Sequence, residues 1–466
     1  MAMRSVLAMA LLVGACGSQV NPDACCTDAA DCATKGLPDG SMCTGGLICR
    51  GNTCVAEDCT TSADCEAGAP FCPSLGLCAA TCDTDAECPG FGGNPIDQFC
   101  SNGGCVQCRD GSDCAMDAPI CDAGACRGCA ADSECASGLC GSAGACVDAA
   151  SIVYLDPAGL DGGDCGQAAP CKTITFAMSK TSATRTTIVM GTGQYVEAVH
   201  LAPGAGLAAD LEIRGSGAVV TTPFHQDTSS FVIDSGFTNV RIDGLTLTNQ
   251  EGNALMSGSP LELHSVTSSG GFYCILAQAG LTAYDVSVSQ CGNGVDVYGQ
   301  LTADGLRIEG SGGMSTGLRV ETGAVVLVNN LVVNKAEFHC IELTSLTHGT
   351  ISFATVADCG SQQTAAPLAV DCIDSSVTLV SSIIWAPGAY SEVSACSLSK
   401  SIVGPNAVTG IPFTDPMFVN FASGDLSLSS SSPAIDMVPT GPATDIIGTP
   451  RPQGAHFDIG AYEYKP

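Results

Sequence analysis

The sequence predicts an all-β protein in which small disulfide-rich modules precede a parallel β-helix. Two internal repeats carry this prediction. The first third of the 466-residue chain repeats a four-cysteine unit, and residues 185–410 repeat a pattern of alternating apolar residues. Only 14% of the residues are charged and 56 are glycine, which favours β structure with many tight turns. A chain of this length has room for two or three domains.

The chain begins as a secretory signal does. One cation, Arg4, precedes an apolar run from Val6 to Val13, and small residues follow. The run is too short for a membrane-spanning helix, which needs about 20 residues. The segment Leu12-Val-Gly-Ala-Cys16 resembles a bacterial lipobox, which implies cleavage after residue 15 and a lipid on the sulfur of Cys16. An ordinary cleavable signal with a chance cysteine is the alternative.

The lipobox resemblance implies a location. Residues 1–15 are then a signal peptide and residues 16–24 a lipidated tether. Several acyl chains at one residue anchor a protein firmly. In the lipoprotein family, a glycine such as Gly17 after the cysteine is compatible with sorting to the outer membrane. We therefore expect a lipid-anchored protein of the outer membrane or cell surface.

A four-cysteine unit recurs five times in residues 25–150. The first two cysteines of each unit are Cys26 and Cys32, Cys59 and Cys65, Cys82 and Cys88, Cys108 and Cys114, Cys129 and Cys135. The last two are Cys49 and Cys54, Cys72 and Cys78, Cys100 and Cys105, Cys121 and Cys126, Cys140 and Cys146. Units this small need disulfides, which form in an oxidising compartment. The pairing inside a unit cannot be read from the sequence.

These units are similar to the short cysteine-rich repeats of bacterial surface lipoproteins, and we interpret them as a stalk. Cys25 and Cys43 are left over in the first unit and can pair with each other. Cys105 and Cys108 have the spacing of a zinc ribbon, as do Cys126 and Cys129. Both are junctions between units, and the other junctions have different spacings, so we favour disulfides and expect no metal.

An acidic residue precedes the second cysteine of every unit. These residues are Asp31, Asp64, Glu87, Asp113 and Glu134. Calcium is conceivable there, but one carboxylate in each unit supplies too few oxygens, so solvated turn residues are the better interpretation. We expect no cofactor. The net charge of −31 also argues against nucleic acid as a partner, because phosphate binding needs a basic face.

The second repeat has the order apolar-x-apolar-x-x-apolar-x-apolar. Its copies start at Val240, Leu261, Leu281, Leu301 and Val326, with a weaker copy at Ile351 and a looser one at Val377. Alternation marks strands with one buried face. The fourth and fifth positions often hold turn-formers, as in Asp243-Gly244 and Asp304-Gly305. Two short strands bent around a turn, repeated every 20–26 residues, indicate a parallel β-helix.

The later cysteines fit this coil. Cys274 begins one strand and Cys291 ends another in the next coil, and Cys340 and Cys359 repeat that relation. We therefore predict the disulfides Cys274–Cys291 and Cys340–Cys359, and by elimination Cys372–Cys396. The remaining pair, Cys165–Cys171, lies ahead of the coil.

Both ends of residues 151–466 resemble known families. Residues 154–164 and 170–178 look like the first strand and cap helix of pectin-lyase-like right-handed β-helix proteins, so we place the cap at 151–184. Residues 411–466 resemble the closing domain of bacterial choice-of-anchor surface β-helix proteins (type Q). The matching segments are Asp415-Pro-Met-Phe418, Gly424-Asp-Leu-Ser-Leu428, Ser432-Pro-Ala-Ile-Asp436, Arg451-Pro452 and Asp458-Ile-Gly-Ala-Tyr-Glu463.

One group of polar residues is a candidate site. In the register above, the fourth position forms a column of Asp243, His264, Tyr284 and Asp304, flanked by Arg241 and Glu262. An acid, an imidazole and a phenol on one face could bind a glycan or do acid–base chemistry. A turn column that merely faces water is the alternative interpretation.

The pectin-lyase-like fold includes lyases, hydrolases and epimerases of polysaccharides, but we find no signature of such an enzyme. No Gly-His-Gly motif occurs; Thr347-His348-Gly349 is only a fragment of a loop. We therefore expect a non-enzymatic surface protein for adhesion or for binding a glycan or protein partner. A polysaccharide lyase, glycoside hydrolase or epimerase on the same fold is the alternative.

Overall fold

The computed structural model divides into two compact units, Met1–Asp148 and Ala149–Pro466. It describes residues 47–50, 53–56, 82, 84–85, 88, 99–115, 117–141, 143–203, 210–223, 229–249, 251–310, 313–321, 323–360, 367–373, 375–406 and 414–466. The sequence places the boundary two residues later, at 150. The lipobox cysteine Cys16 and the leftover Cys25 and Cys43 lie outside the described residues.

The first unit is a series of short antiparallel hairpins. They are formed by β1 (Leu47–Arg50) with β2 (Thr53–Ala56), β3 (Phe99–Ser101) with β4 (Gly104–Val106), and β5 (Ile120–Asp122) with β6 (Ala125–Arg127). The 3-10 turns η4 (Gly111–Asp113) and η5 (Asp132–Glu134) come just before the second cysteine of their modules.

Every module that the structure describes has the same disulfide connectivity, first to third and second to fourth cysteine. The pairs are Cys82–Cys100, Cys88–Cys105, Cys108–Cys121, Cys114–Cys126, Cys129–Cys140 and Cys135–Cys146. The acidic residue before the second cysteine organises the turn. Asp113 accepts hydrogen bonds from the backbone N–H groups of Arg109 and Asp110, and Glu134 accepts from Ala130 and Ala131. These carboxylates therefore cap turns rather than simply face water.

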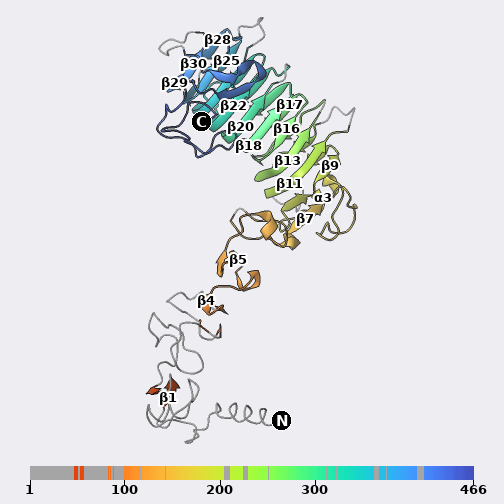
Figure 1. The fold of residues 1–466 in the computed structure, drawn as a ribbon. Helices are drawn as coiled ribbons and strands as arrows, with labels where there is room; N and C mark the ends of the chain where they lie inside the picture. The colour runs from red at the N-terminus through yellow and green to blue at the C-terminus, as the bar shows by residue number, and fades with distance from the viewer. Residues whose placement is uncertain are drawn as a thin grey trace, which may run out of the picture. The chain divides into compact units, whose positions relative to one another are not determined.

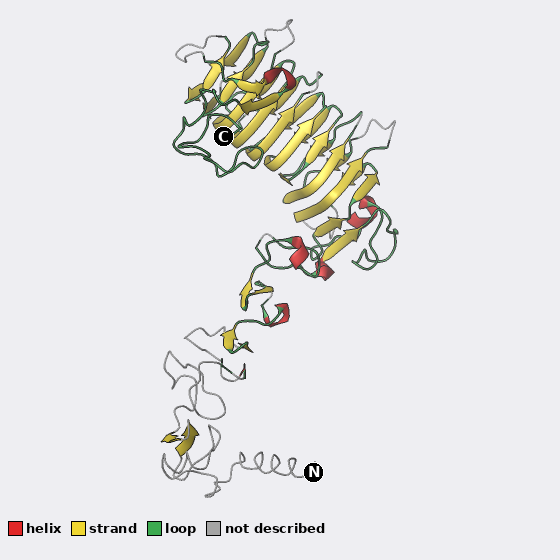
Figure 2. Ribbon diagram, viewed as in Figure 1, coloured by secondary structure: helices red, strands yellow, loops and turns green. Residues whose placement is uncertain are grey.

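The second unit is a parallel β-helix whose strands stack side by side (Figures 1 and 2). One sheet contains β10 (Val199–Leu201), β12 (Phe231–Ile233), β14 (Leu255–Ser257), β17 (Tyr273–Ala277), β19 (Asn293–Val297), β21 (Thr316–Val320), β23 (His339–Leu343), β25 (Leu368–Cys372) and β28 (Ser391–Ser394). We call it the straight sheet. Its strands run parallel and pair in this order.

The other sheet, which we call the bent sheet, is formed by longer segments that turn in the middle. Its strands are β7 (Ile152–Leu155), β8 (Thr187–Met190), β9 (Gly193–Val196), β11 (Asp210–Thr221), β13 (Asn239–Thr248), β15 (Leu261–His264), β16 (Thr267–Ser269), β18 (Leu281–Ser289), β20 (Leu301–Glu309), β22 (Val325–Asn334), β24 (His348–Ala357), β26 (Ser376–Val380), β27 (Ile383–Trp385), β29 (Ser397–Ser399) and β30 (Ile402–Gly404).

The bend comes from one left-handed residue at the fifth position of each repeat. These residues and their φ angles are Gly244 (71°), Ser265 (50°), Asp285 (53°), Gly305 (81°), Asn330 (49°), Phe353 (53°), Ser381 (51°) and Lys400 (50°). The turn-formers at the fourth and fifth positions therefore mark this bend. The apolar positions on either side point inward and merge into one core cluster that runs from Val153 to Val403.

The repeat is in the expected register with one correction. Val240, Leu261, Leu281, Leu301 and Val326 pair in succession, but Val326 pairs with Gly349, not with Ile351. The weaker copy therefore starts two residues earlier than predicted. Gly349 has a φ of 133°, and a β-carbon there would overlap the carbonyl oxygen of Val326. A glycine stands where the pattern required an apolar residue, which hid the true start.

Disulfides join neighbouring segments of the coil. The structure has Cys165–Cys171, Cys274–Cys291, Cys340–Cys359 and Cys372–Cys396, with Cα–Cα distances of 4.9, 5.5, 5.7 and 5.2 Å. Ahead of the first complete coil, η6 (Ala149–Ser151) leads into β7. The helix α3 (Ile174–Met178) then buries Ile174, Ala177 and Met178, and Thr173 caps its N-terminus.

The last 50 residues pack against the side of the bent sheet. The segment contains β31 (Phe418–Asn420), η7 (Phe421–Ser423) and β32 (Asp425–Leu428). Leu428, Ala434 and Ile459 form an apolar cluster with Phe353 and Ile383 of the sheet. The Tyr462 hydroxyl accepts a hydrogen bond of 2.9 Å from Arg307 of β20. The outward face of these strands is therefore apolar where residues 414–466 cover it.

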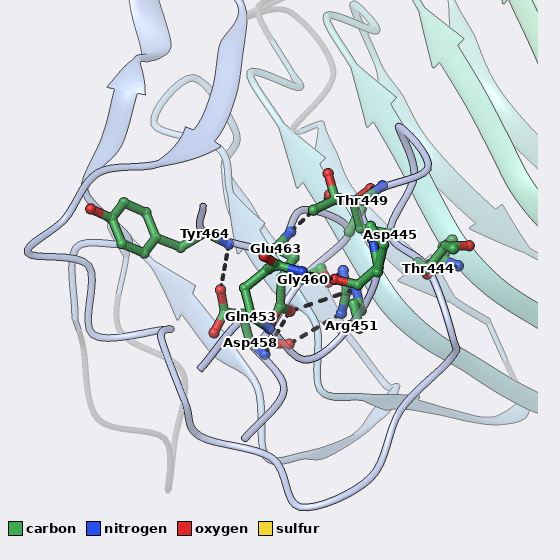
Figure 3. A network of polar contacts seen from close by, with 12 residues as sticks. Thr444, Asp445, Thr449, Arg451, Gln453, Asp458, Gly460, Glu463 and Tyr464 are labelled. Carbon is green, nitrogen blue, oxygen red and sulfur yellow. Dashed lines mark hydrogen bonds and ion pairs between the residues drawn. The ribbon is translucent and has the colours of Figure 1, made fainter. Parts of the chain in front are cut away.

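A buried cation organises this closing segment (Figure 3). The side chain of Arg451 is fully buried. It donates hydrogen bonds to the carbonyl oxygens of Asp458 and Gly460, and its Nε lies 3.7 Å from Glu463. The carboxylates in turn accept backbone N–H groups: Asp458 from Asp436 and Tyr464, and Glu463 from Gln453 and Asp458. Charged side chains thus provide hydrogen-bond partners for backbone groups that have none in a β-sheet.

Replacing the buried cation should destabilise the second unit. We expect Arg451→Met to lower the free energy of unfolding by about 3–5 kcal/mol, because the buried carboxylates of Asp458 and Glu463 would lose their counter-charge. Thermal unfolding with Lys465→Met as control tests this, since Lys465 is basic but exposed. Equal melting temperatures for the two variants would contradict it.

Candidate functional site

The four residues of the predicted column lie next to one another. Asp243 of β13 pairs with His264 of β15, His264 with Tyr284 of β18, and Tyr284 with Asp304 of β20. The rings of His264 and Tyr284 have centroids 4.8 Å apart. The column occupies the fourth position, just before the left-handed residue, so the side chains leave the same edge of the bend in every coil.

Most polar groups of this column already have partners. Arg241 is within 3.4 Å of three carboxylates, those of Glu212, Asp243 and Glu262. His264 Nε2 lies 2.6 Å from Glu262. Further along, Asn330 donates a hydrogen bond to Asp304. The side chains that pair with Arg241 and His264 are only 22–27% exposed, as are Arg241 and His264 themselves, so they form a half-buried ion-pair network.

Tyr284 is the accessible member of the column. It is 39% exposed, and one face of its ring lies against His264. An exposed aromatic ring beside fixed hydrogen-bonding groups can stack on an apolar sugar face while its neighbours bind hydroxyls. The ion pairs hold the geometry, and the ring provides the contact surface.

A second column lies on the outward face of the straight sheet, and the sequence analysis missed it. Leu276 of β17 pairs with Asp296 of β19, Asp296 with Arg319 of β21, Arg319 with Glu342 of β23, and Glu342 with Asp371 of β25. Arg319 Nε lies 2.9 Å from Glu321 and 3.6 Å from Glu342. The carboxylates of Glu321 and Glu342 therefore share one cation.

Asp296 is the unusual member of this second column. It is only 3% exposed, and its Oδ1 atom has no hydrogen-bond partner among the described residues. Burial raises the pKa of its carboxyl from 3.8 to about 6; Glu321 and Glu342 raise it too, whereas Arg319 lowers it. Burial and the Asp296 charge also raise the pKa values of Tyr273 and Tyr298. A carboxyl that titrates near neutral pH can accept or donate a proton.

The signal for this column was weak in the sequence. The strands of the straight sheet are three to five residues long and follow loops of variable length. Their outward residues change from Leu276 to Asp296 to Arg319, so no residue type repeats. The short apolar alternation of Val295, Val297, Leu318 and Val320 could have found it, because the residue between two inward positions must point outward.

The cysteine clusters of the first unit are disulfides. In each described module, three sulfurs lie within 4.8 Å of one another, in groups such as Cys108, Cys114 and Cys126. This proximity results from two neighbouring S–S bonds, which leave no thiolate to ligate a metal. Cys105, Cys108, Cys126 and Cys129, which have zinc-like spacing, are all paired in this way.

Asp296 should make stability depend on pH. The fold binds this proton more tightly than the unfolded chain does, so its contribution is complete below about pH 4 and is lost as pH rises through about 6. We expect Asp296→Asn to gain stability relative to the wild type by up to about 3 kcal/mol between pH 4 and pH 8. Urea unfolding at both pH values measures this. A difference that stays constant with pH would contradict the burial argument.

Comparisons with known proteins give two partial matches. No family model matches this chain. The crystal structure of pectate lyase Pel9A matches 67% of this chain and 96% of that chain, with a TM-score of 0.45 and 14% identity. The strand pairing above, rather than this match, establishes the parallel β-helix. No helix in the described stretches is long and apolar enough to cross a membrane.

The second match is a match in sequence, and it covers a short part of this chain. A stretch of 67 residues, 14% of this chain, is 37% identical to a metallothionein of Astacus astacus and covers 95% of that protein. Every described cysteine of residues 82–146 is nevertheless in a disulfide. The chain thus belongs by sequence to the metallothionein family over this stretch alone, and its larger unit is by its strand pairing a parallel β-helix.

Proposed function

We propose that this chain is a non-enzymatic surface protein whose β-helix binds a glycan or a surface partner. The observation that carries the proposal is the ring contact between His264 and Tyr284, whose planes are tilted by 39°, within the ion-pair network. The network fixes the column before a ligand arrives, so little ordering is required on binding. Repetition at one strand spacing of about 4.8 Å suits an extended ligand that lies along the column.

We further propose that the chain is held at the outer membrane or cell surface by lipid on Cys16. The support is the short apolar run, the small residues and the cysteine in the order of a lipobox. The disulfide modules fit the same location, because they require an oxidising compartment outside the cytoplasm. The C-terminal segment, which resembles a choice-of-anchor domain, would then cover the side of the bent sheet rather than anchor the chain.

A second candidate function is a polysaccharide lyase, hydrolase or epimerase. One specific observation favours it: the Asp296 carboxyl has a pKa of about 6 and lies in the same column as Arg319. A base at neutral pH beside a cation could abstract a proton next to a sugar carboxylate. The low exposure of Asp296 counts against this, because a substrate would have to displace its neighbours to reach the carboxyl.

Incubation with a panel of acidic and neutral polysaccharides distinguishes a binding protein from an enzyme. We expect retention of one or more polysaccharides without cleavage products, and at least a tenfold weaker retention for His264→Ala/Tyr284→Ala, because the stacking surface is lost. Asp296→Asn is the matched control on the other sheet and should bind as the wild type does. New reducing or unsaturated ends that disappear in Asp296→Asn would instead establish the enzyme.

The lipid anchor is tested at the N-terminus. In a bacterial host that processes lipoproteins, we expect the chain to incorporate radiolabelled fatty acid and to sediment with membranes. Cys16→Ser should abolish both, because the sulfur that carries the diacylglycerol is gone. Gly17→Ala is the control and should keep the label. Labelling that persists in Cys16→Ser would refute the assignment.

A further inference from the structure

A cavity opens between the bent sheet and the closing segment, further along the fourth position than Asp304. Its volume is about 550 Å³, and it is lined by residues 438 and 440–442 on one side. The other side is formed by Asn329, Ser352 and Ser399 at the fourth position and by Phe353, Ser381 and Lys400 at the fifth. The size is that of pockets that hold small molecules, about 300–1,000 Å³.

The fold builds this cavity at a fixed place. Asn329 pairs with Ser352, Ser352 with Val380, and Val380 with Ser399, so the lining residues follow one another in register. They continue the column that begins at Asp243, but here residues 438–442 face them. The Arg451 network holds the closing segment in position, and Gly460 N–H bonds to the carbonyl of Ser381.

The polar groups of the lining are free. Within the part of the chain that the structure describes, the side chains of Asn329, Ser352, Ser399, Thr440 and Lys400 make no hydrogen bond or ion pair. Three hydroxyls, one amide and one amine thus converge on a cavity with an apolar wall of Phe353, Val380 and Val438. Convergent unused donors and acceptors around an apolar floor are what recognition of a hydroxylated ligand requires.

The charge of the cavity differs from that of the chain. The chain carries 47 acidic against 16 basic residues, yet among the described residues that line the cavity there is no carboxylate, and Lys400 is the one charged side chain. Lys400 is also left-handed, with a φ of 50°, at a position where two earlier coils have glycine.

We propose that this cavity binds a small hydroxylated anion of the size of one sugar acid. Lys400 pairs with the anionic group, and the Ser352, Ser399 and Thr440 hydroxyls with the Asn329 amide bind the ligand hydroxyls. The cavity lies further along the fourth position than His264 and Tyr284, with Asp304 between them, and substitution of Lys400 tests it without changing that pair.

Calorimetric titration tests the proposal. The probes are D-glucuronate and D-glucose 6-phosphate, with neutral D-glucose as the uncharged comparison. We expect an anion to bind the full chain with a millimolar or lower Kd, and D-glucose to bind at least tenfold more weakly. Lys400→Gln should weaken anion binding about tenfold or more, the loss expected for one charge-assisted hydrogen bond.

Two further variants make the result specific. Lys335→Gln is the matched control, because Lys335 is also left-handed (φ 62°) but does not line the cavity. Ser399→Phe should fill the mouth and abolish binding, with an unchanged melting temperature as the check on folding. If only glucuronate or only glucose 6-phosphate binds, the result supports the proposal and identifies the preferred anion. No heat with either anion, or equal losses in the two lysine variants, would overturn the proposal.

Discussion

The left-handed residue at the bend of each coil is the constraint on which the rest of the second unit depends. It fixes where the strand turns, and parallel pairing then places the same position of each coil one strand spacing from the next. A shift of one residue would exchange the buried and exposed faces. Interior columns can therefore hold only apolar or small residues, and every functional possibility is confined to the outward columns and to the surfaces that cover them.

Because equivalent positions of successive coils lie in columns, charged side chains in neighbouring coils are close enough to attract or repel one another. Like charges in adjacent coils would repel, and the sequence avoids this by alternating signs, as in Glu212, Arg241 and Glu262. The straight sheet alternates from Asp296 through Arg319 to Glu342. It begins beside the apolar Leu276 and departs from the rule at Glu342, which pairs with Asp371. Asp296 thus has a cation on one side only, and burial leaves one of its oxygens without a partner. Burial is the main cause of its raised pKa, and Arg319, which lies on one side only, lowers the pKa without offsetting that effect.

The sequence predicted those features that depend on local periodicity. The coil register, the disulfides Cys274–Cys291 and Cys340–Cys359 and the Asp243–Asp304 column follow from spacing, because parallel stacking translates sequence intervals directly into neighbours in space. Cys372–Cys396 followed by elimination, and Cys165–Cys171 was the pair that remained. The start of the repeat at Gly349 was missed, because the backbone conformation there requires a glycine although the repeat pattern calls for an apolar residue. Asp296 and the cavity beside Lys400 could not be predicted: the first depends on burial by its surroundings, and the second on where residues 438–442 pack, 38 or more residues later in the chain.

The short reach of the disulfides has a consequence for biogenesis. Among the bonds that the structure describes, the cysteines are 6 to 24 residues apart, and no bond joins one module to another. Local contacts also form fastest. A chain that crosses a membrane N-terminus first can therefore oxidise each module as it emerges, and each new coil finds its predecessor already in place. The closing segment emerges last and packs on finished coils, so the order of synthesis can also be the order of assembly.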